Sequence, residues 1–146
     1  MHRQPEHDED VSQGNVELVR SMLADFSAFN RVLAVLAPDF VWDLSAYEGW
    51  TGQERYEGAD AFIEFMRSWT DPYDDLQLET ERIVEAEGGK VVAVLRQRGR
   101  LRGSDSSVEM HYGIVYTVDG GQIRTAQVYA TPDEALRSAR PREETG

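Results

Sequence analysis

The hydrophobic pattern of this 146-residue chain changes once, near residue 72, from a helical period to a strand period. Before that point apolar residues recur every three or four positions, which predicts amphipathic helices over residues 15–29 and 58–69. After it, apolar and polar residues alternate, which predicts four strands joined by tight turns, at residues 76–86, 91–101, 108–118 and 123–129. Helices followed by an antiparallel meander predict an α+β fold whose sheet curls over the helices.

Shorter elements are predicted between and after these segments. Asn15 is a suitable cap for the first helix. A second helical piece, over residues 32–36, ends before Pro38, and residues 40–44 read as a short strand. The stretch Thr-Pro-Asp-Glu that begins at Thr131 has the composition of a capping box, so it predicts a closing helix.

Charge and composition limit the classes of partner. There are 27 acidic and 15 basic residues, and the net charge of −12 repels the phosphates of nucleic acids and of anionic membranes. The absence of cysteine excludes disulfides and cysteine-based metal sites. No apolar run is typical of a signal peptide or a membrane span, so we expect a cytoplasmic protein that binds neither nucleic acid nor membrane and needs no cofactor.

The two ends of the chain differ in composition from the rest. Residues 1–14 and 140–146 are charged and poor in apolar side chains, so we expect loosely ordered tails. A single domain is then predicted over residues 15–139, which is long enough to enclose a small-molecule cavity.

Aromatic residues are concentrated in one quarter of the chain. Nine of the fourteen lie between Phe40 and Tyr73, including all three tryptophans. Such a concentration indicates either the wall of an apolar pocket or a tightly packed core. The alternation of the long strands separates two faces. Leu95 and Gln97 are predicted to face inward, whereas Arg96 and Arg98 face outward.

Four sequence motifs together resemble the SnoaL-like branch of the nuclear transport factor 2-like superfamily. They are AFN at 28–30, LAPDFVW at 36–42, YEG at 56–58 and YTVDGGQI at 116–123. The resemblance extends over about residues 15–139 and implies a cone, in which a curled sheet surrounds helices and a pocket, and which usually dimerises through the outer face of the sheet. The segment over residues 30–38 is several residues shorter than is usual in that family, so we expect a short second helix.

The family includes polyketide cyclases, ketosteroid isomerase, limonene-epoxide hydrolase, dehydratases and proteins without catalytic activity, so the fold alone fixes no reaction. The isomerase base matches Leu44, or Asp43 if a bulge shifts the register, and the oxyanion-binding acid matches Ile114. The charged cluster of the epoxide hydrolase matches Leu95, Gln97 and Val128, none of which is charged. Both mechanisms therefore lack their residues in this chain.

Two carboxylates are the remaining catalytic candidates. Asp25 falls on the flank of the apolar stripe of the first helix, where burial would raise its pKa and suit it to acid or base chemistry. Asp43, next to Trp42, is the second candidate. The alternative for both is a side chain that reaches water. His111 is predicted to lie on the outer face, which favours an interface over a catalytic role.

The inward stripes of the helices, the strand alternation and the resemblance together predict a cavity. We expect its ligand-binding residues to be Trp42, Leu44, Tyr47, Trp50, Phe62, Met66, Leu95, Gln97, Met110, Tyr112, Ile114 and Val128. We also expect a homodimer through the outer face, with Arg96, Arg98, His111, Gln127 and Tyr129 at the contact and the arginines facing acidic residues of the partner copy.

Three functions fit these expectations. The first is an isomerase, cyclase or dehydratase that moves protons on an apolar, oxygenated ring compound. The second is a non-catalytic protein that binds hydrophobic ligands, and the third is an interaction domain that uses only its outer surface. A buried acid beside an open cavity favours the first, an open cavity without one favours the second, and a filled cone favours the third.

Overall fold

The computed structural model describes residues 4–24 and 29–140. Its helices are α1 (Gln4–Ala24), α2 (Phe29–Ala34), α3 (Ala59–Thr70) and α4 (Pro132–Ala139), with a single 3-10 turn, η1 (Glu87–Gly89). The strands are β1 (Leu36–Asp43), β2 (Arg55–Glu57), β3 (Tyr73–Ala86), β4 (Lys90–Leu101), β5 (Ser107–Asp119) and β6 (Gln122–Tyr129).

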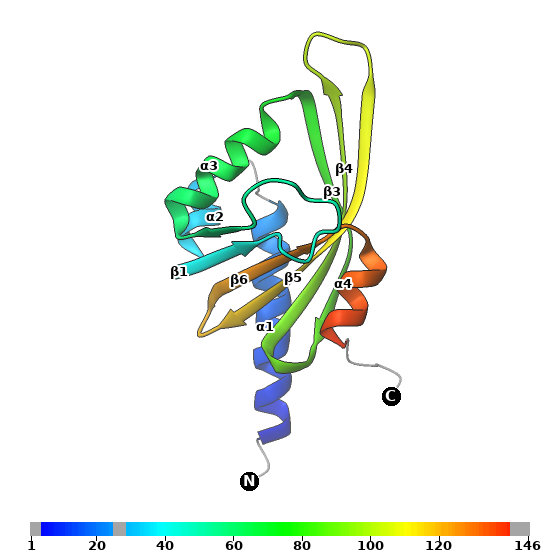
Figure 1. The fold of residues 1–146 in the computed structure, drawn as a ribbon. Coiled ribbons are helices and arrows are strands. Elements are labelled where there is room, and N and C mark those ends of the chain that lie inside the picture. Colours follow the sequence, from blue (N-terminus) through cyan, green and yellow to red (C-terminus); the bar gives the residue numbers. More distant parts are fainter. Residues whose placement is uncertain (1–3, 25–28, 141–146) are drawn as a thin grey trace.

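The six strands form one curled sheet in the order β2-β1-β6-β5-β4-β3. Helices α1 and α3 pack against one face of this sheet and α4 packs against the other (Figure 1). The predicted α+β fold, with a curled sheet around N-terminal helices, is confirmed. The sheet is mixed, however, because β1 runs parallel to β6 while the other neighbours are antiparallel.

The N-terminal half differs most from the prediction. Helix α1 begins at Gln4, so Asn15 lies inside the helix instead of capping it. The short second helix is present, but over Phe29–Ala34. Strand β1 begins as early as Leu36 and contains Pro38, which is tolerated because the register with β6 is irregular between Leu36 and Val41.

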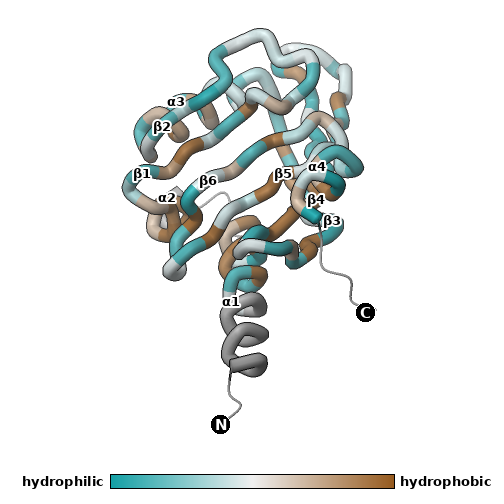
Figure 2. Tube along the Cα trace, turned by 60° about the horizontal axis from the view of Figure 1, so that its bottom comes forward, coloured by the Kyte–Doolittle hydropathy of each residue, from teal (hydrophilic) through white to brown (hydrophobic). Residues whose placement is uncertain are grey.

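Two hydrophobic clusters occupy opposite faces of the sheet. The larger one joins α1, α3 and β1 to the inner face, where Ala93 and Leu95 of β4 are buried. The smaller one contains Val92 and Val115 beneath α4 on the outer face. This arrangement follows from strand alternation, because neighbouring residues of β4 point to opposite faces. Hydrophobic and hydrophilic residues accordingly alternate along the strands in Figure 2.

Helix α4 begins as its sequence predicts. The Thr131 hydroxyl accepts a hydrogen bond from the Glu134 backbone N–H, at 3.2 Å, and Pro132 occupies the first turn. The Glu134 carboxylate accepts a hydrogen bond from the same hydroxyl, at 3.1 Å. This cap places α4 across the outer face of β4 and β5.

A bulge in β3 changes which of its residues face inward. Thr80 pairs with Leu95 and Arg82 pairs with Val94, so Glu81 is an extra residue on the β3 side. Leu78 faces inward before the bulge and Ile83 does so after it, because both pack on the inner cluster. The bulge therefore keeps the inner face of β3 apolar where a strict period of two would not.

Candidate functional site

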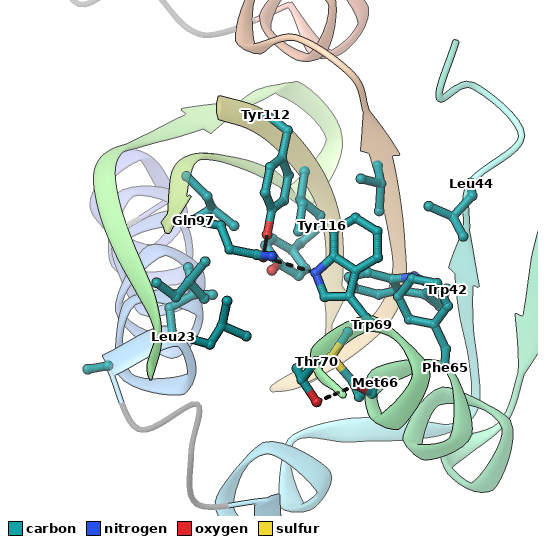
Figure 3. A pocket seen from close by; sticks show the side chains of 16 residues that line it. Leu23, Trp42, Leu44, Phe65, Met66, Trp69, Thr70, Gln97, Tyr112 and Tyr116 are labelled. Carbon is teal, nitrogen blue, oxygen red and sulfur yellow. Dashed lines mark hydrogen bonds between the residues drawn. The ribbon is translucent and has the colours of Figure 1, made fainter. Parts of the chain in front are cut away.

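A cavity of about 360 Å³ lies between the inner face of the sheet, the end of α1 and one side of α3 (Figure 3). Its size falls within the range of about 300–1,000 Å³ that is typical of small-molecule pockets. The lining is mostly aliphatic and aromatic, and consists of Leu23, Ala24, Trp42, Leu44, Phe65, Met66, Trp69, Thr70, Leu76, Leu78, Leu95, Gln97, Tyr112, Ile114, Tyr116 and Val128.

Helix α3 forms one wall of the pocket because of how it begins. Gly58 precedes the helix with φ of +90°, a conformation that suits glycine, and its N–H donates to the Phe40 carbonyl at 2.7 Å. This bond ties the start of α3 to β1. The apolar stripe of α3 then turns toward the sheet, which buries Phe65 and Met66.

Gln97 is the polar centre of the pocket and is only 4% exposed. Its Oε1 atom accepts two hydrogen bonds, one from Trp69 Nε1 at 2.9 Å and one from the Tyr112 hydroxyl at 2.8 Å. Its Nε2 atom lies 3.9 Å from Met110 Sδ, a weak acceptor. These bonds join α3, β4 and β5 around one buried amide, as Figure 3 shows for the first two.

Two other polar atoms of the lining have no such partner. Trp42 Nε1 is buried, in a residue 7% exposed, and makes no hydrogen bond with the described part of the chain. Within the same part of the chain, no hydrogen bond joins the hydroxyl of buried Tyr116 to another residue. Buried donors are almost always paired in proteins, so the unpaired Trp42 N–H is an exception.

The described lining of the pocket carries no charge at neutral pH. None of its described lining residues is an acid, a histidine, a lysine or an arginine. Its ionisable groups are tyrosines, and burial raises the pKa of Tyr112 and of Tyr116 far above the ordinary value of 10.0. Both hydroxyls therefore remain protonated and can donate hydrogen bonds.

Eight of the twelve residues predicted to line the cavity do so: Trp42, Leu44, Met66, Leu95, Gln97, Tyr112, Ile114 and Val128. The other four do not. Phe62 packs in the core between Phe40 and Trp42, with ring centroids 5.4 and 5.0 Å away. Met110 contacts the amide nitrogen of Gln97 from outside the pocket lining.

Tyr47 and Trp50 form an aromatic layer outside the pocket. Their ring centroids are 5.9 Å apart, and Trp50 also packs at 5.9 Å from Phe65, which does line the cavity. The Trp50 Nε1 atom donates to the Gln53 carbonyl at 2.9 Å, so its polar end is directed to the connection between β1 and β2. These two residues support the wall from outside it.

The two candidate acids have different outcomes. Asp43 is absent from the lining, although its neighbours Trp42 and Leu44 belong to it, because alternation along β1 turns it the other way. Its Oδ1 atom accepts a hydrogen bond from the Ser45 N–H at 2.8 Å, which is a turn-forming contact. Asp25 lies outside the described residues. It follows Leu23 and Ala24, which line the pocket.

Eight lining residues were not predicted. Leu76 and Leu78 alternate with Gln77 and Glu79, so strict alternation at the start of β3 would have found them. Trp69 belongs to the predicted apolar stripe of α3, but it was not among the residues expected to bind a ligand. The others are Leu23, Ala24, Phe65, Thr70 and Tyr116.

The outer face of the sheet carries a network of ion pairs within the chain. Arg96 contacts Glu81 at 2.6 Å and Glu109 at 2.9 Å, and Arg98 contacts Glu109 at 3.1 Å. His111 Nε2 lies 2.6 Å from Glu81. The arginines face outward as predicted, but they meet acids of their own chain, Glu109 included. That they also meet acids of a partner copy stays a prediction.

Two further classes of site are absent from the described residues. No three histidine, aspartate or glutamate side chains in that part of the chain are grouped so that they could hold a metal ion. Across the same residues, no helix combines the length and the apolar character needed to cross a membrane.

With the fold and pocket established, comparison with known proteins identifies the family. The model of the SnoaL-like domain matches residues 14–126. The chain belongs to the SnoaL-like domain family. No curated protein matches the chain. The SnoaL-like assignment therefore rests on the domain model and on the fold.

Solved structures of similar fold are numerous. An NTF2-like protein of unknown function from Burkholderia pseudomallei is 22% identical, with a TM-score of 0.68, and the match covers 86% of this chain and 97% of that one. A SnoaL-like candidate polyketide cyclase from Jannaschia sp. CCS1 is 19% identical, with a TM-score of 0.70 and coverage of 95% and 96%. An LEH-like epoxide hydrolase from M. tuberculosis is 18% identical, with a TM-score of 0.63 and coverage of 88% and 86%. These similarities show a shared NTF2-like fold.

Proposed function

We propose that this SnoaL-like protein binds a small, largely apolar ring compound that carries oxygen, in the pocket around Gln97. The observation that carries the proposal is a cavity of about 360 Å³ whose described lining is apolar and neutral at neutral pH. An apolar ring gains free energy on entering such a pocket because its surface leaves water. Among the described lining residues, none would stabilise a charged ligand by ion pairing.

Binding can be tested with fluorene, a flat tricyclic hydrocarbon, by equilibrium dialysis. Leu78 lines the pocket, so Leu78→Trp should fill it and abolish binding. Leu101 is exposed at the end of β4, so Leu101→Trp adds the same group outside the pocket and should leave binding unchanged. Equal loss in both variants, or no binding by the unaltered protein to fluorene and to its oxygenated analogue 9-fluorenone, would contradict the proposal.

A catalytic role, as isomerase, cyclase or dehydratase, is the second candidate. It is favoured by one observation: Leu23 and Ala24 line the pocket and Asp25 is the next residue in the sequence. A carboxylate at the pocket could remove a proton from the carbon next to a ring carbonyl, while a protonated tyrosine such as Tyr116 donates to the carbonyl oxygen.

The exchange of the α-hydrogens of 1-indanone with deuterated water tests this step, followed by NMR. A catalyst should accelerate the exchange above the buffer rate, and Asp25→Asn should return it to that rate without weakening the binding of fluorene. Asp43→Asn is the matched control, because Asp43 lies outside the lining. If the unaltered protein does not accelerate the exchange, binding without this proton transfer is the remaining function.

A further inference from the structure

A second hollow, of about 420 Å³, adjoins the apolar pocket at the end of α3. Thr70 lines both spaces, and its hydroxyl donates to the Met66 carbonyl at 2.9 Å (Figure 3). Unlike the pocket, the hollow is polar and open to water. Its described lining consists of Arg67, Ser68, Thr70, Asp71 and Arg102. Thr70 thus lies where an apolar, uncharged space meets one that carries cations.

Arg102 is held in place with hydrogen-bond donors left over. It follows the last residue of β4, in a hairpin that extends past the end of α3 (Figure 1). Its backbone N–H donates to the Pro72 carbonyl at 2.8 Å, and its Nε donates to the Asp71 carbonyl at 3.0 Å. Its terminal nitrogens lie 3.9 Å from the Asp71 carboxylate and 3.7 Å from that of Asp74. Both distances exceed a hydrogen bond, so the terminal N–H groups stay available to a ligand.

Arg67 supplies the second cation of the hollow. It lies in the last turn of α3 and is exposed, and its guanidinium makes no ion pair within the described part of the chain. Arg96, Arg98 and Arg100 differ, since each has a carboxylate oxygen within 3.1 Å. The hollow therefore brings together two guanidinium groups that lack a close carboxylate, in a chain whose net charge is −12.

Guanidinium groups bind carboxylates through paired N–H donors in a fixed planar geometry. Two arginines and one aspartate leave the lining with one positive charge, which one carboxylate would balance. We propose that the hollow binds the carboxylate of a ligand whose apolar part fills the pocket, so that this protein binds an amphipathic organic acid. This rests on the proposed binding function, and it places the oxygen of the ligand outside the apolar lining.

Acids and their primary amides test the proposal, because the two groups have the same shape and differ in charge. The probes are fluorene-2-acetic acid and fluorene-2-butyric acid, which offer two tether lengths, with the amide of each and with fluorene itself. Equilibrium dialysis at neutral pH and low salt gives the dissociation constants. At one tether length or both, we expect the acid to bind about three- to fivefold more tightly than its amide, as exposed ion pairs allow. Salt at about 0.5 M should reduce this preference.

Charge variants locate the site. Arg67→Gln and Arg102→Gln should each lower the preference for acid over amide, and the affinity for the amides should not change. Asp71→Asn should raise the preference, because it removes the negative charge that opposes the ligand. Arg82→Gln is the matched control: Arg82 is exposed on β3 and belongs to neither lining, yet its loss changes the net charge equally. It should leave the preference unchanged.

The outcomes separate this inference from the proposed function. If acid and amide bind equally at both tether lengths, or if Arg82→Gln lowers the preference as much as Arg67→Gln does, the hollow binds no carboxylate. The inference is then wrong, while binding of fluorene still supports the proposed function. If neither fluorene nor any acid or amide binds, both proposals fail.

Arg67 also lies where a cation complements the partial negative charge of a helix end. That role alone would lower the free energy of unfolding in Arg67→Gln and leave the ratio of acid to amide affinity unchanged, which would contradict the inference. Circular dichroism melting curves identify any variant that does not fold. Should Arg102→Gln be such a variant, Arg67→Gln and Asp71→Asn decide the question.

Discussion

Ala135 packs so closely on Gly113 that a Cβ atom added to Gly113 would lie 2.6 Å from the Ala135 Cβ. The same added atom would be 3.4 Å from the Pro132 Cα, which is backbone. Gly113 is thus the position on β5 that lets α4 approach the outer face of the sheet. Because Gly113 and Ala135 are both small, α4 lies close to the outer face of the sheet.

Gly113→Ala should therefore destabilise the protein, by about 1–3 kcal/mol as overpacked cores do. Gly14→Ala is the matched control, because a Cβ on Gly14 meets nothing within 4 Å and the residue lies in α1. That control should raise stability slightly, by about 0.5–1 kcal/mol, since alanine favours helix. Urea denaturation measures both, and equal stability of the two variants would contradict the packing argument.

Gln97→Leu should destabilise the protein by leaving Trp69 Nε1 and the Tyr112 hydroxyl without their acceptor. Each buried donor that loses its partner costs about 1–3 kcal/mol. The double variant Gln97→Leu with Trp69→Phe removes one of the two unpaired donors, so it should recover part of the loss. Free energies of unfolding from denaturant titration give the comparison. A double variant that is less stable than the sum of both single changes would contradict it.

Alkaline pH should unfold the protein through its buried tyrosines. Burial raises the pKa of Tyr112 and of Tyr116 above the ordinary 10.0, so the folded state favours the neutral forms. Their contribution is fully present below pH 10 and is lost as the pH rises toward the folded pKa values, because the unfolded chain ionises first. Two such groups give a slope of about 2.7 kcal/mol per pH unit.

The ultraviolet absorbance of tyrosinate, followed together with circular dichroism, measures this effect. Tyr112 and Tyr116 should ionise only as the structure is lost. Tyr116→Phe should reduce the slope by about half, since one titrating group remains. Ionisation of all tyrosines before unfolding would contradict the burial of these hydroxyls.

The ion pairs on the outer face predict a dependence on acidic pH. A hydrogen bond from Arg96 holds the pKa of Glu81 below its ordinary 4.5, and His111 adds to the effect. The contribution of Glu81 to stability is present above pH 4.5 and is lost as the pH falls through the lowered pKa. Glu81→Gln should thus be less stable than the unaltered protein at neutral pH, and this difference should vanish in acid. If Glu81→Gln were less stable in acid as well, the loss of stability would come from altered packing and not from the lost ion pairs, which would contradict the prediction.

Dimerisation through the outer face is a further prediction. The outer face carries His111, Gln127 and Tyr129. Tyr129 packs beside the cluster beneath α4, and its hydroxyl donates to Gln127 Oε1 at 2.9 Å. Since Arg96 and Arg98 already pair within the chain, a partner copy would rest mainly on Tyr129 and its neighbours. Sedimentation should show a dimer at micromolar concentration that Tyr129→Asp dissociates. If the unaltered protein sediments as a monomer, the predicted dimer is refuted.

Strand alternation made the inner face of β4 predictable. Gln97 stands between Arg96 and Arg98, which cannot be buried unpaired, and Leu95 shares the face of Gln97. The same rule predicted Tyr112 and Ile114 in the pocket. It could not predict the parallel pairing of β1 with β6, since nothing local to Leu36 or Val41 indicates a partner about eighty residues away. Nor could it predict the bulge at Glu81, which depends on pairing with β4.

The candidate site was harder to predict than the fold for a related reason. Phe62 and Trp69 belong to one helical stripe, yet Phe62 fills the core and Trp69 lines the cavity, so periodicity separates buried from exposed residues but not core from pocket. The role of Gln97 as a shared acceptor depends on α3 and β5 meeting it from both sides. That meeting is a property of the assembled sheet.

Along β4, consecutive residues belong to two surfaces: Gln97 serves the cavity, and Arg96 and Arg98 serve the ion pairs outside. An insertion or deletion of one codon in this strand would exchange the two sets, placing guanidinium groups in the cavity and apolar groups in water. Point substitutions at either surface disturb only that surface. The gene segment for β4 should therefore vary by substitution and not by length, and ligand preference and outer-face contacts can diverge independently within it.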